Sequence, residues 1–410
     1  MPERADDSPR WIVRRAVKVA LAGALRAAGV DRAVSRLRRA EAGGTRVLVL
    51  AYHRVVPAFA DAAREALPSL VVSAETLRLQ LEQVARTHDL VTLADATRIL
   101  TAASAAPRDV AAVTFDDGYA DNHDVALPVL AALRAPATLF VATGFTGTRR
   151  RLLHDRLFAS LSELARRGIP YPRAELAAPA QSLLAACADR GPAATLDRLV
   201  ARLPHRALAA VADALERRTG LHEEDLPAGT RVLGWEELRA MQAAGVELGG
   251  HSVHHAVLSN LPIEEARREI VGCRDDLAER AGRRPRHFAY PNGYHTPAVR
   301  TAVAEAGFEA ALTTEDRENV RAAPPLAVCR KVLWENTTRG PLGYSASLAS
   351  CCFAGVFQAL RLARAVRGER ADAPGTEPGA AAGSRLPGGR EEPRDPFRTV
   401  AGGPSERELC

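Results

Sequence analysis

The chain has 410 residues, of which 47% are hydrophobic and 25% are charged. This composition is typical of a globular protein and excludes a chain that is disordered throughout. The formal net charge is +6, and the basic residues are nearly all arginine, since the sequence contains two lysines, Lys18 and Lys331. Because no basic patch is interleaved with aromatic residues, we expect no nucleic-acid partner.

Basic charge is concentrated near the two ends of the chain, in three arginine-rich runs: Arg14–Arg15, Arg36–Arg39 and Arg361–Arg370. Residues 10–40 are predicted to form one amphipathic helix within a basic N-terminal segment, 1–44. The apolar stretch Val17–Val30 contains Arg26 and lacks a clear cleavage site, so a secretory signal fits poorly and a cytoplasmic location is expected. The basic ends suit either a solvated surface or peripheral contact with an anionic membrane.

An α/β domain is predicted over residues 45–340, because apolar strands alternate there with helices. The predicted strands are Arg46–Tyr52, Leu90–Leu93, Val110–Phe115, Ala137–Ala142, Val246–Leu248, His287–Tyr290, Ala310–Thr313 and Val328–Leu333. The predicted helices are Ser73–Arg86, Ala94–Ala103, Ala126–Leu133, Trp235–Ala244, Pro262–Ala281 and Thr296–Ala306. Residues 150–230 carry few strand signals, and we expect them to form a helical insertion.

An apolar and basic C-terminal helix is predicted over residues 341–368. Within it, Leu342–Leu360 runs for nineteen residues without a charge, which is long enough to span a membrane. Attachment to a membrane surface and packing on the α/β domain are the other two interpretations, and all three stay open. Residues 369–410 are rich in Gly, Pro, Arg and Glu and are expected to be a disordered tail.

Two adjacent carboxylates, Asp116 and Asp117, follow the predicted strand that ends at Phe115, and Gly118 allows a sharp turn after them. Carboxylates at the carboxyl end of a buried strand lie where α/β barrels place their active sites. The same residues alone would be equally typical of a turn with a helix cap. Asp121 and Asn122 are expected to cap the next helix.

The segment Gly249–His255 also follows a predicted strand, and its His251 and His255 are four residues apart. In a helical turn the two imidazoles would point the same way, which is a common arrangement for holding a divalent cation. His254 is expected to point away, and Ser252 to cap the turn. Two histidines together with a carboxylate leave coordination positions open for water and substrate, so the two segments together predict a metal site.

The chain resembles the polysaccharide deacetylases, known as carbohydrate esterase family 4 or the NodB-homology group, and especially the branch acting on poly-N-acetylglucosamine-like substrates. The resemblance covers residues 46–335 apart from the insertion. It rests on six segments: TFDDG at 114–118, HSVHH at 251–255, FAYPNG at 288–293, YHRV at 52–55, AGF at 306–308 and TT at 313–314.

The resemblance implies a deformed (β/α) barrel of the NodB-homology type, here with a helical insertion and helical terminal extensions. It also implies a divalent metal, usually zinc, and an acetylated glycan or amino-sugar substrate. Carried over by position, Asp116 is the catalytic base. The implied metal ligands are Asp117, His251 and His255.

Two departures from the family pattern affect the site. The arginine that orients the base in many members is replaced here by Ala289, and Arg286 or Arg330 are the candidates to substitute for it. A late histidine that acts as general acid is also missing, because no histidine follows His295. His53 is therefore our candidate for the acid or for a substrate ligand, with a structural hydrogen bond as its alternative.

Four residues are candidates for binding the substrate: Tyr290, Pro291, Arg330 and Trp334. The rings of Tyr290 and Trp334 could stack on sugars or lie in the core.

The leading hypothesis is a metal-dependent glycan N-deacetylase. A lipid-linked or nucleotide-linked amino sugar is the second substrate hypothesis, favoured by the poor signal-peptide fit, and a catalytically inactive carbohydrate-binding homologue is the third hypothesis.

Overall fold

The computed structural model describes residues 9–63, 65–101, 106–172, 175–187, 189–319 and 325–360. One parallel sheet of eight strands lies at its centre, in the order β10-β1-β5-β6-β7-β8-β9, with β4 also paired to β5. The strand bounds are β1 Val47–Tyr52, β4 His88–Leu90, β5 Asp109–Phe115, β6 Ala137–Val141, β7 Glu247–Gly250, β8 His287–Ala289, β9 Ala310–Leu312 and β10 Lys331–Val332. The central strands β1, β5 and β6 are buried along their whole length, which explains their unbroken apolar sequences.

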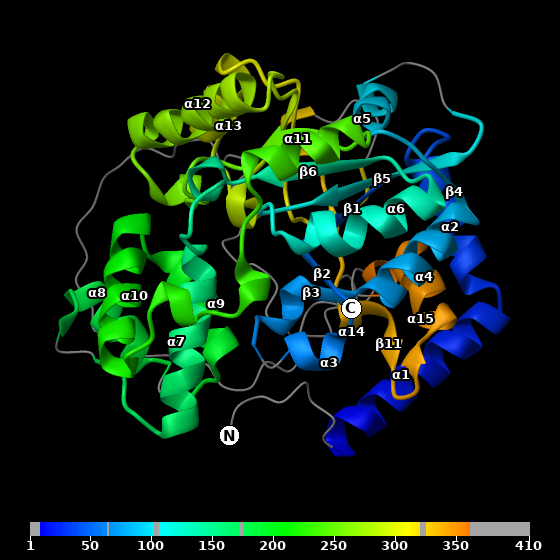
Figure 1. Cartoon of the computed structure of the whole chain (residues 1–410). Coiled ribbons are helices and arrows are strands. Elements are labelled where there is room, and N and C mark those ends of the chain that lie inside the picture. Colours follow the sequence, from blue (N-terminus) through cyan, green and yellow to red (C-terminus); the bar gives the residue numbers. More distant parts are fainter. Residues whose placement is uncertain are drawn as a thin grey trace, which may run out of the picture.

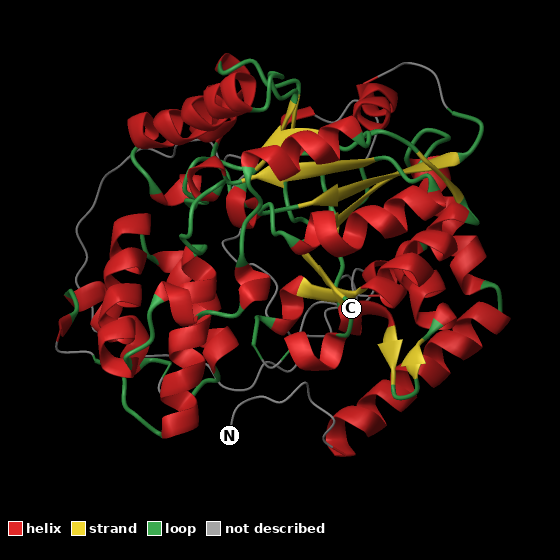
Figure 2. Ribbon diagram, viewed as in Figure 1, coloured by secondary structure: helices red, strands yellow, loops and turns green. Residues whose placement is uncertain are grey.

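The sheet curls into a deformed barrel, as the sequence predicted. Its two outer strands, β9 and β10, are joined along the chain by a segment in which Val328 forms a parallel bridge with Leu312. Since all strands of the sheet are parallel, their carboxyl ends meet at one rim. Figure 2 shows that the arrowheads of the central strands point to the side of the sheet where the insertion lies.

Helices cover the outside of the sheet: α4 Ala74–Ala85, α5 Leu93–Thr101, α6 Leu127–Leu133, α11 Trp235–Ala243, α12 Ile263–Arg280 and α13 Pro297–Glu305. Ser73 caps α4 by accepting a hydrogen bond from the Thr76 N–H. One predicted boundary is wrong, because the strand expected at Leu90–Leu93 ends at Leu90 and Leu93 already begins α5. A small second sheet pairs β2 Arg54–Val56 with β3 Val71–Ser73, near the short helix α3 Phe59–Ala62.

The insertion is helical, as predicted, and has a leucine-rich core of its own. Its helices are α7 Leu153–Arg167, α8 Ala178–Ala185, α9 Pro192–Arg202 and α10 His205–Thr219. Buried leucines from all four helices form one cluster, which includes Leu161, Leu184, Leu199 and Leu215. Figure 1 shows the insertion in green beside the barrel, on the side opposite α1 and α15.

The predicted single N-terminal helix is two helices, α1 Pro9–Ala27 and α2 Val30–Glu41. The two helices are separated at Gly29, which has a left-handed φ of 72°. Glycine adopts this conformation easily, and it ends a helix. The predicted C-terminal helix is interrupted within the described residues: α15 spans Ala346–Phe353, Gly355 follows with a φ of 77°, and residues 356–360 are helical again.

The charge-free stretch Leu342–Leu360 begins in the turn of a hairpin that pairs β11 Arg339–Gly340 with β12 Gly343–Tyr344 and follows α14 Glu335–Thr338. Helix α15 packs on the barrel and on α1. None of the described helices is long and apolar enough to cross a bilayer. The expected disordered tail 369–410 and the arginines after Leu360 lie outside the described residues.

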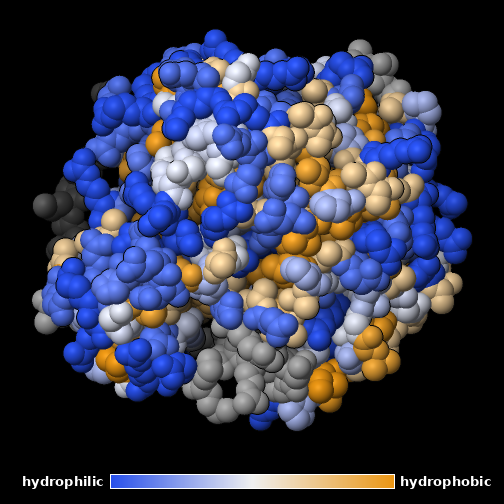
Figure 3. Space-filling model, viewed as in Figure 1, coloured by the Kyte–Doolittle hydropathy of each residue, from blue (hydrophilic) through white to orange (hydrophobic). Residues whose placement is uncertain are grey.

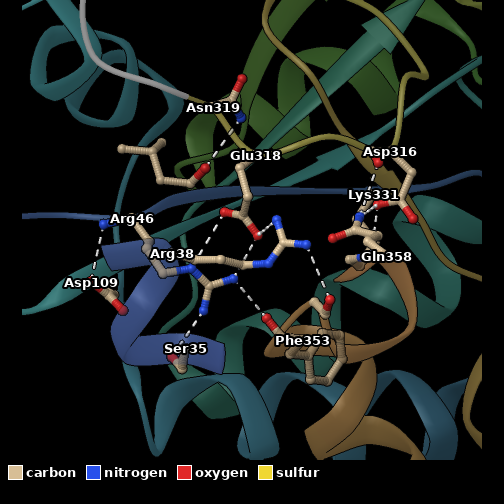
Figure 4. A network of polar contacts seen from close by, with 12 residues as sticks. Ser35, Arg38, Arg46, Asp109, Asp316, Glu318, Asn319, Lys331, Phe353 and Gln358 are labelled. Carbon is tan, nitrogen blue, oxygen red and sulfur yellow. Dashed lines mark hydrogen bonds and ion pairs between the residues drawn. The ribbon is translucent and has the colours of Figure 1, made fainter. Parts of the chain in front are cut away.

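A buried polar network attaches both terminal extensions to the barrel (Figure 4). The guanidinium of Arg46, at the start of β1, donates hydrogen bonds to Glu318, to the Ser35 hydroxyl of α2 and to the Phe353 carbonyl of α15. Arg38 of α2 also forms an ion pair with Glu318. A charge buried this deeply is stable only when it is paired, so the network holds α2 and α15 in place together.

Candidate metal centre and active site

The loop after β5 turns sharply and separates the two adjacent carboxylates. Asp117 and Gly118 both have left-handed backbones, with φ of 75° and 81°. Glycine adopts this conformation freely, whereas for an aspartate it costs on the order of 1 kcal/mol, so surrounding contacts must hold Asp117 there. As a result, Asp116 faces Arg330 and Asp117 faces two histidines.

Asp117, His251 and His255 come together as the sequence predicted, with one ligand atom from each within 4.8 Å of the others. The Nε2 atoms of His251 and His255 lie 3.5 and 3.1 Å from Asp117 Oδ1. His251 Nδ1 lies 2.7 Å from the carbonyl oxygen of Ala289 and donates to it, which leaves the Nε2 lone pair directed at Asp117.

The donor set fits a divalent cation. Asp117 is buried, and neither of its oxygens accepts a hydrogen bond within the described part of the chain. Burial alone would raise the pKa of Asp117, but His255 and His251 outweigh burial and hold this pKa well below its usual value. Burial likewise acts to lower the pKa of His255, and Asp117 more than compensates, so this pKa is raised. An ionised carboxylate facing two imidazole nitrogens is a typical zinc ligand set.

The two histidines do not converge through a helical turn, so that expectation is wrong. Residues 251–256 form an irregular loop in which Ser252 and His255 have left-handed φ of 61° and 52°. Ser252 Oγ accepts a hydrogen bond from the Ala256 N–H, as a turn cap does. His254 points away from the triad, and its ring and backbone N–H both contact Glu269.

Asp116 forms a buried bidentate pair with Arg330, with two N–O distances of 2.7 Å. Arg330 Nε also donates to the Thr313 carbonyl and Nη1 to the Thr114 hydroxyl, so four of the five guanidinium N–H groups are bonded. Burial acts to raise the pKa of Asp116, but Arg330 and then His251 outweigh it and leave this pKa below its usual value. Of the two candidates to replace the missing arginine, Arg330 is the one that contacts Asp116, whereas Arg286 pairs with Glu309 at the surface.

His53, directly after β1, lies beside the proposed base. Its Nε2 is 3.9 Å from Asp116 Oδ2, and its backbone carbonyl accepts a hydrogen bond from Asn122 Nδ2. Burial lowers the pKa of His53, and Arg330 and His251 lower it further, against the opposing effect of Asp117 and Asp116. The imidazole is therefore neutral at neutral pH.

The expected substrate-binding set needs correction. Tyr290 and Trp334 are buried, and the Tyr290 hydroxyl donates to the Leu326 carbonyl, so both rings belong to the interior. Pro291 is buried as well, and so is Arg330, which directs four of its five N–H groups at Thr313, Thr114 and Asp116. The expected cap at Asp121 is also wrong, because this side chain binds Arg54 and the Val55 N–H instead.

The sequence analysis missed two residues at the site, His154 and Asp155, which lie in the first turn of α7. His154 Nε2 is 3.9 Å from Asp117 Oδ2 and 2.7 Å from the Tyr119 hydroxyl, which donates to Asp155. Both residues belong to the insertion, which contains none of the six segments on which the resemblance rests. Their one sequence signal is a histidine and an aspartate side by side in an otherwise apolar and arginine-rich stretch, LLHDRLF.

Carboxylates and imidazoles lie together at the carboxyl rim of this parallel barrel, where barrel enzymes have their active sites. These are the side chains that metal-assisted hydrolysis uses. The sequence model of one family, described as polysaccharide deacetylase, matches residues 103–173 and 177–311, just over half of the chain. The chain therefore belongs to the polysaccharide deacetylase family and is an enzyme of the carbohydrate deacetylase class. No curated protein matches its sequence.

Several solved structures are similar to this chain. The deacetylase PplD of Streptococcus pyogenes, solved with acetate, is 17% identical with a TM-score of 0.47, over 73% of this chain and 96% of that one. IcaB of Ammonifex degensii is 18% identical with a TM-score of 0.48, over 75% and 97% of the two chains. A de-N-acetylase of Aggregatibacter actinomycetemcomitans is 16% identical with a TM-score of 0.45, over 70% and 94%.

Proposed function

We propose that the protein is a metal-dependent hydrolase that removes N-acetyl groups from a glycan or amino-sugar substrate. The observation that carries this proposal is the buried Asp117 carboxylate, which faces two imidazole nitrogens and accepts no hydrogen bond from a described residue. Zinc is the metal we expect, because two histidines and one carboxylate with open positions are typical of catalytic zinc sites. Family membership supports an acetylated carbohydrate as substrate.

A divalent metal held by Asp117, His251 and His255 would acidify a coordinated water and polarise the acetyl carbonyl. In our proposal Asp116 accepts the proton of the attacking water, and Arg330 keeps this carboxylate ionised and correctly oriented. His53 Nε2 lies 3.9 Å from Asp116 Oδ2, so in our proposal one bridging water carries that proton to His53, which passes it to the leaving nitrogen as the carbon–nitrogen bond breaks. One proton of the water thus moves to the amine, and the other leaves with acetic acid, which ionises to acetate in solvent.

The test of this proposal is acetate release from a panel of acetylated oligosaccharides, nucleotide-linked amino sugars and lipid-linked amino sugars. We expect release by the zinc-loaded protein, loss of release after chelation, and recovery when Zn²⁺ is restored. Asp116→Asn is the matched inactive control. Substrate binding without acetate release would instead support the carbohydrate-binding hypothesis, and a protein that binds no divalent metal would refute the proposal.

The exposed surface of α1 and the β11–β12 hairpin favours a lipid-linked amino sugar over the other two substrate classes. Helix α1 packs on α15 through Ala22 but exposes four large apolar side chains on its outer side: Ile12, Val13, Val17 and Leu21. The turn of the adjacent β11–β12 hairpin exposes Leu342 completely. Figure 3 shows hydrophobic surface over α1 and this hairpin at the lower right.

The same helix carries the charge that an anionic bilayer attracts. Arg10 and Arg14 are exposed on α1, and the helix sequence contains no acidic residue. An apolar row flanked by basic side chains is typical of helices that lie in the membrane interface. We therefore propose that the protein docks peripherally on an anionic membrane through α1 and the tip of the β11–β12 hairpin.

Co-sedimentation with vesicles of phosphatidylcholine and phosphatidylserine tests the docking proposal. We expect binding at low salt, weaker binding at high salt, and a several-fold loss in Val17→Glu and Leu342→Glu. Leu37→Glu is the matched control, because Leu37 is equally exposed but lies on α2. Unchanged binding of Val17→Glu would contradict the proposal, and a dimer that this variant dissociates would assign the face to a second copy of the chain.

A further inference from the structure

Both ends of the helical insertion hold the loop that carries Asp117. At its exit, the Arg231 carbonyl accepts a hydrogen bond from the Ala120 N–H at 2.8 Å, and the Leu233 N–H donates to the Gly118 carbonyl at 2.9 Å. Val232 between them forms an antiparallel bridge with Tyr119. The segment that leaves the insertion therefore pairs with the backbone directly after the metal-binding carboxylate.

At its entrance, the insertion holds the side chain of the same Tyr119. The buried hydroxyl of Tyr119 donates to Asp155 Oδ2 at 2.9 Å and lies 2.7 Å from His154 Nε2. A tyrosine hydroxyl has one proton, so His154 is the donor in the second contact. Leu152 and Phe145 pack with the tyrosine in one small apolar cluster.

This network adjoins the metal ligands directly. His154 Nε2 lies 3.9 Å from Asp117 Oδ2, and the rings of His154 and His255 meet edge to face at 5.1 Å. Asp117 Oδ1 faces the two ligand histidines, whereas His154 lies beside the other oxygen, Oδ2. The left-handed backbone of Asp117 costs on the order of 1 kcal/mol, and contacts of this kind offset that cost.

We propose that Tyr119, His154 and Asp155 form a positioning network through which the insertion holds Asp117 in the orientation that binds the metal. This inference rests on the proposed metal-dependent function and deepens it. The inserted helices are then a structural part of the metal site, because His154 adjoins Asp117 and the Tyr119 hydroxyl ties the loop after Asp117 to α7. The network contacts the ligand from outside, and partners of this kind typically change metal affinity by about 10–100-fold.

The test is the Zn²⁺ affinity of the full chain, measured by competition with a chromophoric chelator. Tyr119→Phe removes only the hydroxyl and keeps the ring, and we expect it to weaken Zn²⁺ binding by about 10–100-fold. Asp155→Leu should weaken it similarly, whereas Asp155→Asn keeps an acceptor oxygen and should restore most of the affinity. Tyr171→Phe is the matched control, since its hydroxyl contacts Thr195 inside the insertion, away from the loop.

The thermal unfolding midpoint of each metal-free variant separates positioning from simple destabilisation. Weaker Zn²⁺ binding in Tyr119→Phe, with an unfolding midpoint close to that of Tyr171→Phe, supports the inference. Wild-type Zn²⁺ affinity in both Tyr119→Phe and Asp155→Leu would overturn the inference and leave the proposed function intact. A wild-type protein that binds no Zn²⁺ would overturn both.

Discussion

The barrel and the helical insertion are built on separate cores but meet at one chemical site. The barrel core lies between the sheet and its covering helices, whereas the insertion packs its four helices around its own leucines. The barrel supplies Asp116, Asp117, His251 and His255 from the ends of its strands, and the insertion supplies His154 and Asp155 from the first turn of α7.

The two regions differ in how well the sequence predicts where their site residues lie. Parallel strands end at one rim, so residues that follow β5 and β7 must lie near one another even though they are far apart in sequence. No comparable rule places the first turn of an inserted helix, because its position depends on how the inserted helices dock. The predictions below test this division between the two regions, beginning with the largest expected effect.

Substitutions of the two adjacent aspartates of the barrel should inactivate the enzyme in different ways. Asp116→Asn should lower kcat by about 10³–10⁴ with Zn²⁺ still bound, because the ligand triad is intact but the base is lost. Asp117→Asn should lose metal and activity together, because a neutral oxygen replaces an anionic ligand. Metal analysis beside acetate release measures both effects. Metal loss in Asp116→Asn with retention in Asp117→Asn would reverse the two roles.

His53→Ala should lower kcat by about 10² while its metal content stays normal, because solvent partly replaces the proton donor to the leaving nitrogen. His222→Ala, at an exposed position of the segment after α10, is the control and should behave as the parent does. Turnover of His53→Ala close to that of the parent would indicate that His53 has a purely structural role.

Core truncations should reveal whether the two regions unfold separately. Leu199→Ala in the insertion and Leu139→Ala in the barrel each remove a fully buried side chain and should cost about 2–5 kcal/mol. In hydrogen exchange, Leu199→Ala should accelerate exchange in α9 and α10 only, and Leu139→Ala should accelerate it throughout the sheet. Equal acceleration everywhere in both variants would mean that the molecule is one cooperative unit.

The smallest effect concerns acid stability of the barrel. Burial, and then the charge of Arg46, lowers the pKa of His88 to about 3, so the folded state keeps this imidazole neutral while the unfolded chain takes up a proton below about pH 6.5. Stability from this residue is therefore complete above that pH and falls as pH decreases, by about 1.4 kcal/mol per pH unit.

His88→Gln should make urea unfolding less dependent on pH between 6.5 and 5.5, and His222→Gln is the exposed control. A slope as steep in His88→Gln as in the parent would show that His88 does not contribute to acid sensitivity.

The sequence by itself determined the alternating architecture, the helical nature of the insertion, and the closeness of Asp117 to His251 and His255. These followed from local patterns: apolar strands, apolar residues at helical spacing in the predicted helices, and motifs placed directly after strands that must share one rim. The tertiary structure decided the rest. It paired Arg330 with Asp116 through a strand far along the chain, placed Tyr290 and Trp334 in the interior, and brought His154 to the metal centre. These contacts depend on how separately formed elements dock, and nothing in the local sequence encodes that docking.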